Sequence, residues 1–178
     1  MAFTPRTWVV GETVTAAIMN AEIRDQFNQR QLFTYKTADT PRATATQSDD
    51  PHLTLTAEAN ARYVMEGLLI VDTSDATQAD LSLDWTVPAG ATGRWVGIGQ
   101  PSSATGTDGT VRTVVSNIDA LRTYGATVDS ANQLGIVLRG LLITSTTAGT
   151  YAVNWARTGT AGTLILVANS WLMLRRVA

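Results

Sequence analysis

The chain has 178 residues, enough for one domain with a full hydrophobic core plus an appendage, and short for two complete domains. Its formal net charge is only -2, so the sequence lacks the basic character typical of nucleic-acid-binding proteins, and we expect no nucleic-acid partner. The absence of cysteine excludes disulfides, thiolate metal sites and thiol nucleophiles, so the fold must depend on packing and association.

No apolar run reaches the roughly 20 residues that are needed to cross a bilayer, and we expect no membrane segment. The N-terminus also lacks the charged start and apolar centre of a signal peptide. Threonine is plentiful and often alternates with apolar residues, and threonine favours strands. The composition therefore predicts a mainly β protein.

Residues 1–33 are predicted to form an N-terminal arm that contains one helix. An extended apolar segment, made of Trp8, Val9 and Val10, ends at Gly11, and Thr15 is suited to be the N-cap of a helix that runs to about residue 30.

The predicted helix carries a narrow apolar stripe. Met19, Ile23 and Phe27 recur at four-residue steps, with polar residues mostly off this line. A narrow stripe favours contact with a few other helices over packing on a broad sheet, although packing on its own domain is an open alternative.

Residues 34–52 form a polar segment that contains Pro41 and Pro51. Because proline cannot donate to a central ladder, this segment is predicted to be a linker or an edge strand. A β-sandwich domain is then expected over residues 53–178.

About ten short strands are predicted in this part of the chain, and their spacing predicts an antiparallel sandwich of the jelly-roll type. Residues 62–72 and 134–143 are apolar on both faces, which we interpret as burial on both faces. The other predicted strands are residues 52–56, 81–87, 95–98, 111–118, 121–128, 151–155, 163–167 and 170–177.

Two segments of the predicted sandwich are similar to each other. Residues 67–70 and 140–143 both have the sequence Gly-Leu-Leu-Ile, and each is followed by an alternating strand that ends in tryptophan, Trp85 or Trp155. This similarity predicts two related Greek-key halves, although buried strands also resemble one another by composition alone.

The sequence offers little catalytic chemistry. His52, the only histidine, follows Asp50 closely, but sequence neighbours seldom face each other productively, so we interpret it as a solvated loop residue. Asp72, Asp75 and Asp80 are oxygen ligands that calcium would accept, but polar turns are the favoured interpretation. We expect no cofactor, no metal ion and no enzymatic activity.

Residues 5–30 resemble the N-terminus of virion proteins of tailed bacteriophages, especially phages that infect actinobacteria. The resemblance is carried by residues 7–17, TWVVGETVTAA, followed by Asn20 and by residues 23–25, IRD. Such proteins are described as head decoration, head fibre or minor tail proteins. Residues 170–177 resemble the closing strand of a tumour-necrosis-factor-like or C1q-like jelly roll, a fold that commonly forms trimers.

The resemblance implies a homotrimeric structural protein of the virion. It would decorate the capsid by attaching its arm to the major capsid protein, or to tail or portal-vertex proteins, and would stabilise the shell. The expected contact residues are Phe3, Trp8, Val9 and Val10 for the virion surface, and Met19, Ile23 and Phe27 for self-association.

The alternative is a minor tail or fibre protein whose sandwich binds a glycan of the host surface. Exposed aromatic residues at an outer groove, for instance Trp95 or Tyr124, would indicate that function. A glycan-cleaving enzyme would require two carboxylates that face one cleft, and nothing in the spacing demands them.

Overall fold

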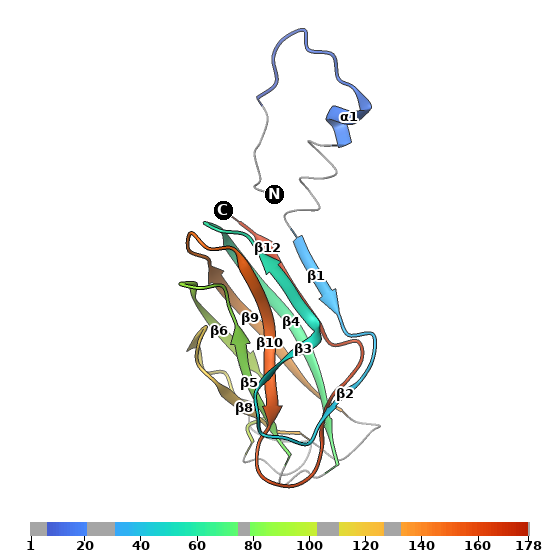
Figure 1. The fold of residues 1–178 in the computed structure, drawn as a ribbon, viewed down its shortest axis with the longest axis vertical. Helices are drawn as coiled ribbons and strands as arrows, with labels where there is room; N and C mark the ends of the chain where they lie inside the picture. The colour runs from blue at the N-terminus through green and yellow to red at the C-terminus, as the bar shows by residue number, and fades with distance from the viewer. Residues whose placement is uncertain (1–6, 21–30, 75–78, 103–110, 127–132, 178) are drawn as a thin grey trace.

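The computed structural model describes residues 7–20, 31–74, 79–102, 111–126 and 133–177. Two antiparallel sheets face each other as a β-sandwich, and the described part of the arm lies beyond one end of it (Figure 1). The predicted mainly β fold, an antiparallel sandwich preceded by an arm with a short helix, is confirmed.

The elements are distributed as follows. The large sheet contains, in spatial order, β1 (Gln31–Tyr35), β12 (Trp171–Arg176), β4 (Arg62–Thr73), β9 (Leu134–Ile143), β6 (Thr92–Ile98) and β7 (Ser116–Asn117), with β11 (Leu164–Leu166) and β2 (Thr40–Arg42) continuing it beside β4. The small sheet contains β3 (Ser48–Ala57), β10 (Gly149–Arg157), β5 (Leu81–Thr86) and β8 (Arg122–Tyr124). The helix α1 spans Ala16–Met19.

The connectivity of these strands is that of a jelly roll. The order β1-β12-β4-β9 in the large sheet lies over the order β3-β10-β5-β8 in the small sheet. Consecutive strands of this set alternate between the two sheets except at β5 and β8, which pair within the small sheet, as the two Greek keys of a jelly roll require. Strands β6 and β7 extend the large sheet at the edge of β9.

The two similar segments occupy equivalent positions in this fold. Their Gly-Leu-Leu-Ile sequences lie in β4 and β9, which pair at the centre of the large sheet, and the strands that follow, β5 and β10, pair in the small sheet. Trp85 and Trp155 are both buried in the core. Each half thus contributes one strand to each sheet and one tryptophan to the space between them.

Aromatic side chains fill the middle of the sandwich. The ring of Trp85 stacks on Tyr151 with 5.0 Å between the centroids, and it meets Trp95 edge to face at 5.5 Å. Trp95 in turn lies 6.5 Å from Tyr124. Such pairs contribute roughly 0.5–1.5 kcal/mol each beyond the burial of their surface. Trp85 and Trp95 thus belong to the hydrophobic core.

The segment predicted as a linker or edge strand contains edge strands. Among the described strands, Pro41 lies in β2, which pairs only with β11, and Pro51 lies in β3, which pairs only with β10. The register of β3 against β10 shifts at residues 50–53, so Pro51 sits in a bulge. The boundary predicted after residue 33 is too late, because β1 begins at Gln31 and is already part of the large sheet.

Two predicted strands are shorter than expected. Residues 111–118 contribute only β7, and residues 121–128 contribute only β8 within their described part. Three exposed residues lie outside any strand: Val111, Val114 and Val115. Their β-branched side chains favour the strand conformation, but without a neighbouring strand to pair with they did not form one.

The end of β1 is held by a buried ion pair. Lys36, the only lysine of the chain, follows β1 directly and is fully buried, as is Asp50 of β3. Nζ of Lys36 donates to Oδ2 of Asp50 at 2.7 Å and to Oγ1 of Thr40 at 2.7 Å. The indole Nε1 of Trp155 donates to the same Oδ2 at 3.1 Å. These contacts join β1, β2, β3 and β10.

The second carboxylate oxygen of Asp50 is also satisfied. Oδ1 accepts the backbone N–H groups of His52 and Leu53 at 2.9 and 3.1 Å, which stabilises the bulge around Pro51. The Lys36 backbone bonds to residues 169 and 170 at the start of β12. The ion pair therefore links the edge strand that carries the arm to both sheets.

We expect Asp50→Asn to destabilise the fold strongly. The substitution leaves the Lys36 ammonium buried without an anion, and breaking a buried pair in this way costs about 3–5 kcal/mol. Urea denaturation followed by circular dichroism measures the loss. The matched control is Asp119→Asn, an exposed carboxylate for which a change within roughly 0.5 kcal/mol is expected. Equal stability of Asp50→Asn and wild type would contradict the role given to the pair.

We expect Gly97→Ala to destabilise the sandwich by about 1–3 kcal/mol. A Cβ at this position would overlap the hydroxyl group of Tyr124, which donates to the Gly97 carbonyl at 3.2 Å. At Gly135 of the neighbouring strand β9, the nearest atom to an added Cβ is 3.5 Å away, so Gly135→Ala is the control and should be tolerated. The measurement is the melting temperature of each variant. Equal melting temperatures of Gly97→Ala and Gly135→Ala would contradict the prediction and show that the Tyr124 side chain can move away from the added Cβ.

Candidate interaction surfaces

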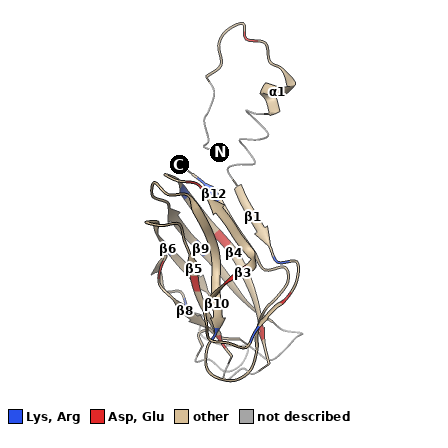
Figure 2. Cartoon of the chain, viewed as in Figure 1, with Lys and Arg blue, Asp and Glu red and all other residues tan. Residues whose placement is uncertain are grey.

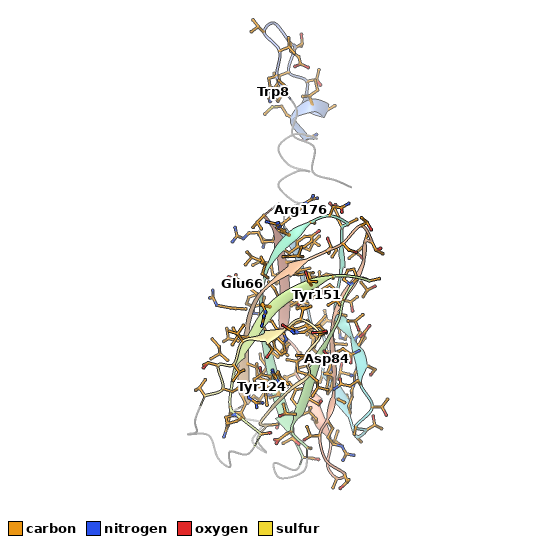
Figure 3. All side chains as sticks on the ribbon, turned by 90° about the vertical axis from the view of Figure 1, so that its left-hand side faces the viewer. Trp8, Glu66, Asp84, Tyr124, Tyr151 and Arg176 are labelled. Carbon is orange, nitrogen blue, oxygen red and sulfur yellow. The ribbon has the colours of Figure 1, made fainter. Side chains whose placement is uncertain are left out.

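The predicted virion-binding residues lie on a solvent-exposed arm. None of the described residues of the arm, 7–20, is buried. Trp8 is 46% exposed, and Val9 and Val10 are still more exposed. Figure 3 shows Trp8 beyond the end of the sandwich that carries Arg176. Phe3, the remaining predicted contact residue, lies outside the described residues.

The local structure of the arm agrees with the sequence prediction. Gly11 has a φ of +85°, and the Glu12 N–H donates to the Val9 carbonyl at 3.1 Å, so a turn closes the extended apolar segment. Thr15 caps α1: its side chain accepts the Ile18 N–H at 3.3 Å.

The predicted self-association stripe is described only in part. Met19, at the end of α1, is 42% exposed. Ile23 and Phe27 lie outside the described residues, so the continuation of the helix and its stripe stays a prediction.

A second apolar surface, which the sequence did not predict, covers the outer face of the large sheet. The pairing registers place one residue each of β1, β12, β4, β9 and β6 side by side in rows that point away from the core. One row is apolar across all five strands. Its members are Tyr35, Trp171, Leu68, Val137 and Ile98.

The two adjacent rows complete what we name the outer face. Three rows across five strands comprise fifteen positions. The second row is Phe33, Met173, Glu66, Arg139 and Val96, and the third is Gln31, Arg175, Val64, Leu141 and Arg94. Phe33 and Tyr35 are 53% and 52% exposed, and Val137 and Ile98 are 40% and 36% exposed.

Aromatic rings concentrate at the β1 edge of this face. The ring of Phe33 lies 6.3 Å from Tyr35 and 6.0 Å from Trp171, measured between centroids. Trp171 therefore belongs to the outer surface in the single chain. Contiguous exposed apolar patches of this kind mark interaction sites in soluble proteins.

The small sheet provides an internal comparison. Its outward positions follow the usual apolar-in, polar-out alternation. They are Asp49, Asn154 and Asp84 in one row, Thr54, Ala152 and Thr86 in the next, and Ala156, Ser82 and Thr123 in the third. Ala152, Ala156 and Ser82 are themselves buried, so the polar side chains at the remaining positions define this face. Asn154 donates to Asp49 at 2.7 Å across this face. The apolar character of the outer face is thus specific to the large sheet.

The interpretation of residues 62–72 and 134–143 as strands buried on both faces is wrong. Inward residues of β4 and β9, such as Leu69 and Ile136, are fully buried, but outward residues such as Leu68 and Val137 retain exposure. A two-layer sandwich covers each sheet on one face only. In a two-layer sandwich, a strand that is apolar on both of its faces therefore indicates an apolar surface that the second sheet does not cover.

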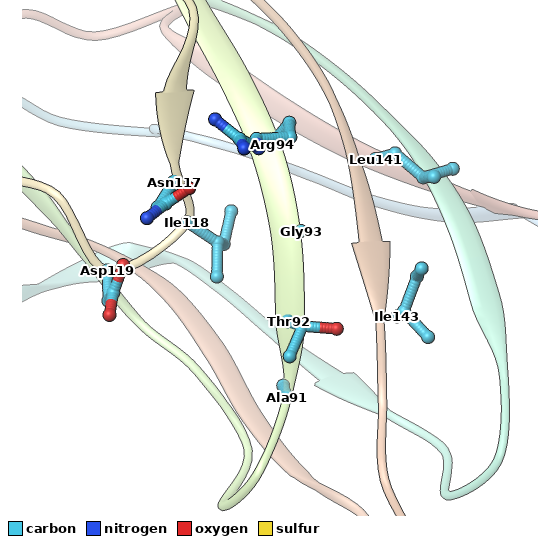
Figure 4. A pocket seen from close by; sticks show the side chains of 9 residues that line it. All are labelled: Ala91, Thr92, Gly93, Arg94, Asn117, Ile118, Asp119, Leu141 and Ile143. Carbon is cyan, nitrogen blue, oxygen red and sulfur yellow. The ribbon is translucent and has the colours of Figure 1, made fainter.

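A cavity of about 410 Å³ opens at one corner of the outer face, where β6, β7 and β9 meet (Figure 4). Its floor is largely aliphatic, with Leu141 and Ile143 of β9 and the buried Ile118. Asp119 is the single carboxylate among the lining residues, so this cavity does not offer the pair of carboxylates used in glycoside hydrolysis.

The prediction that Trp95 and Tyr124 are exposed at a glycan-binding groove is wrong. Trp95 and Tyr124 are each only 1% exposed, and both belong to the aromatic core. Burial raises the pKa of the Tyr124 hydroxyl, which donates to the Gly97 carbonyl. The Gly97-Ile98-Gly99 sequence therefore serves close packing against Tyr124.

His52 lies in β3 and is not a loop residue. Its Nδ1 lies 3.5 Å from the Lys36 Nζ and 4.0 Å from Oδ1 of Asp50. Because the Asp50 carboxylate is already engaged by Lys36, Trp155 and backbone amides, it does not orient His52 as a catalytic base.

The acidic residues considered for calcium are used within the fold where they are described. Asp72 accepts the Thr73 N–H at 2.7 Å, Asp80 accepts the Ala126 N–H at 3.1 Å, and Asp75 lies outside the described residues. Burial raises the pKa of Asp80. Within the described ranges, no group of three His, Cys, Asp or Glu residues is arranged to hold a metal ion.

Charge is sparse on the molecule. Figure 2 shows basic and acidic residues scattered over the described chain without a large region of one sign. Among the elements that the structure describes, no helix has the length and apolar character that crossing a bilayer requires.

No protein-family model matches the sequence, and no curated protein matches it either. The solved structures that this chain resembles weakly include two viral proteins. A tripod from the baseplate of bacteriophage Tuc2009 is 11% identical, with a TM-score of 0.31, over 99% of this chain and 76% of the other. The VP2 subviral particle of infectious bursal disease virus is 14% identical, with a TM-score of 0.18, over 84% and 41%. At such TM-scores, these similarities say nothing about the function of this chain.

Proposed function

We propose that the chain is a structural protein of a tailed-phage virion, a homotrimer that decorates the capsid and attaches through its N-terminal arm. The observation that carries the proposal is the described arm itself. It precedes a fully formed jelly roll, presents Trp8, Val9 and Val10 to solvent and buries none of its described residues. Exposed apolar side chains on a segment outside the core are suited to a partner surface.

The sequence resemblance of residues 5–30 to actinobacteriophage virion proteins supports the same assignment. The residues that carry it, 7–17, form the exposed turn and the capped start of α1. The major capsid protein is the proposed partner, with tail or portal-vertex proteins as the other surfaces that an arm of this kind would fit.

The proposed mechanism is stabilisation by mass action. A protein that binds the assembled shell and not its free subunits stabilises the assembly by RT ln(1 + [L]/Kd). If three arms engage one virion, each weak apolar contact is multiplied by the effective concentration that the first contact creates. No chemical step and no cofactor are required.

The glycan-binding alternative, a minor tail or fibre protein, has less support. The aromatic residues named for it, Trp95 and Tyr124, are buried. The exposed rings of Phe33 and Tyr35 and the partly exposed ring of Trp171 lie on the outer face of a sheet, whereas ligand pockets are concave and carry placed polar groups.

We expect the double variant Trp8→Asp, Val10→Asp to lose virion binding while it keeps its fold. The measurement is co-sedimentation with virions of the encoding phage from which the gene has been deleted. The matched control is Val111→Asp, Val114→Asp, which places the same charges on exposed valines of the sandwich. Loss of at least ten-fold in bound protein is expected for the arm variant alone; undiminished binding would refute the arm as the attachment site.

We expect Ile23→Asp combined with Phe27→Asp to weaken the trimer, because charges on the predicted stripe would have to be buried between helices. Sedimentation velocity of the full chain gives the outcome. An unchanged sedimentation coefficient would show that the stripe has no part in self-association.

A further inference from the structure

We propose that the outer face of the large sheet is a contact surface between copies of this chain. The inference concerns association alone and holds whether or not the arm binds a virion. It starts from the contrast between the two sheets of the same molecule. The outward positions of the small sheet carry no large apolar side chain, whereas the large sheet carries an apolar row across five strands on its outer face.

The residue types of the outer face are those that protein interfaces favour. Tyr, Trp, Phe, Met and Arg are enriched in interface cores, and lysine is depleted. The face contains Tyr35, Trp171, Phe33, Met173 and Arg139. A surface selected only for contact with water would have no reason to keep these side chains in neighbouring rows.

The size of the face is sufficient for a specific contact. A standard interface buries roughly 800 Å² per partner with about 20–30 residues on each side, or about 30–40 Å² per residue. The fifteen positions of the outer face then correspond to about 500 Å² per copy and about 1,000 Å² in total, the lower limit for a specific contact.

The charges at the centre of the face favour a second copy over a partner of one charge. Glu66 and Arg139 are paired across β4 and β9, with 3.4 Å between carboxylate oxygen and guanidinium nitrogen, and both remain partly exposed. Because each copy presents an anion and a cation side by side, two copies can exchange these two partners at the centre of the face. The other charged residues of the face, Arg94 and Arg175, lie in the third row, away from this pair.

The position of the arm gives a further reason for a second copy. The arm joins the sandwich at β1, and β1 is the edge strand of the same sheet that carries the outer face (Figure 1). Copies in contact at the β1 edge of this face, where the aromatic rings concentrate, would hold their β1 strands close together. Their arms would then leave the assembly from neighbouring points, as simultaneous engagement of several arms requires.

The test is sedimentation equilibrium of the full chain and of Val137→Lys, Ile98→Lys. Both residues are partly exposed in the apolar row, and lysine would place charges in the contact. The matched control is Val111→Lys, Val114→Lys, which adds the same charges away from the face. We expect wild type and control to associate, and the face variant to associate at least ten-fold more weakly with an unchanged circular dichroism spectrum. A wild type that is monomeric at 100 µM, or a face variant that associates like wild type, would overturn the proposal.

A labelling measurement covers the case in which the lysine variant does not fold. Because the chain has no cysteine, Val137→Cys and Val114→Cys each introduce a single thiol for a pyrene label. Residues in a contact between copies give excimer emission that falls on dilution. We expect this emission, or failing it a concentration-dependent change in pyrene monomer fluorescence, from position 137 and not from position 114. Identical signals at both positions would overturn the proposal.

Discussion

The buried pair of Lys36 and Asp50 is the constraint on which the position of the arm depends. Its carboxylate takes hydrogen bonds from Lys36 of the segment after β1, from Trp155 of β10 and from two backbone amides of β3. A buried charge is tolerated only when it is paired and its remaining hydrogen-bonding capacity is used, and here each polar contact comes from a different part of the chain. The end of β1 is therefore held between the two sheets, and the arm starts from a fixed edge.

The two sheets differ in the side chains that they turn away from the core. The core uses one face of each sheet. The small sheet closes its other face with hydroxyls, carboxylates and an amide, while the large sheet leaves apolar side chains outside. Burying such a surface between copies is favourable by roughly 25 cal/mol for each Å² removed from water, before the cost of association is counted. In the proposed function, the exposed arm would meet the virion, and the apolar sheet face would meet a second copy of the chain.

The candidate site could be predicted only in part. The turn after Val10 and the cap at Thr15 follow from local rules, because a glycine with positive φ and a threonine hydroxyl need only their nearest neighbours. The outer face could not be found in this way. Val137 and Trp171 lie next to Leu68 through pairings between strands distant in sequence, and no local pattern reveals which of two apolar faces a second sheet will cover.

The sequence by itself determined the class of the fold, most of its strands and the edge position of the prolines, because alternation and the missing proline N–H act within a few residues. Only the tertiary structure decided the roles of residues that the sequence left without function. It placed the single lysine in a buried ion pair, put His52 in a strand beside it and moved Trp95 and Tyr124 from a supposed groove into the core. The physical reason is that burial and partnership depend on the packing of two sheets against each other, which no single segment contains.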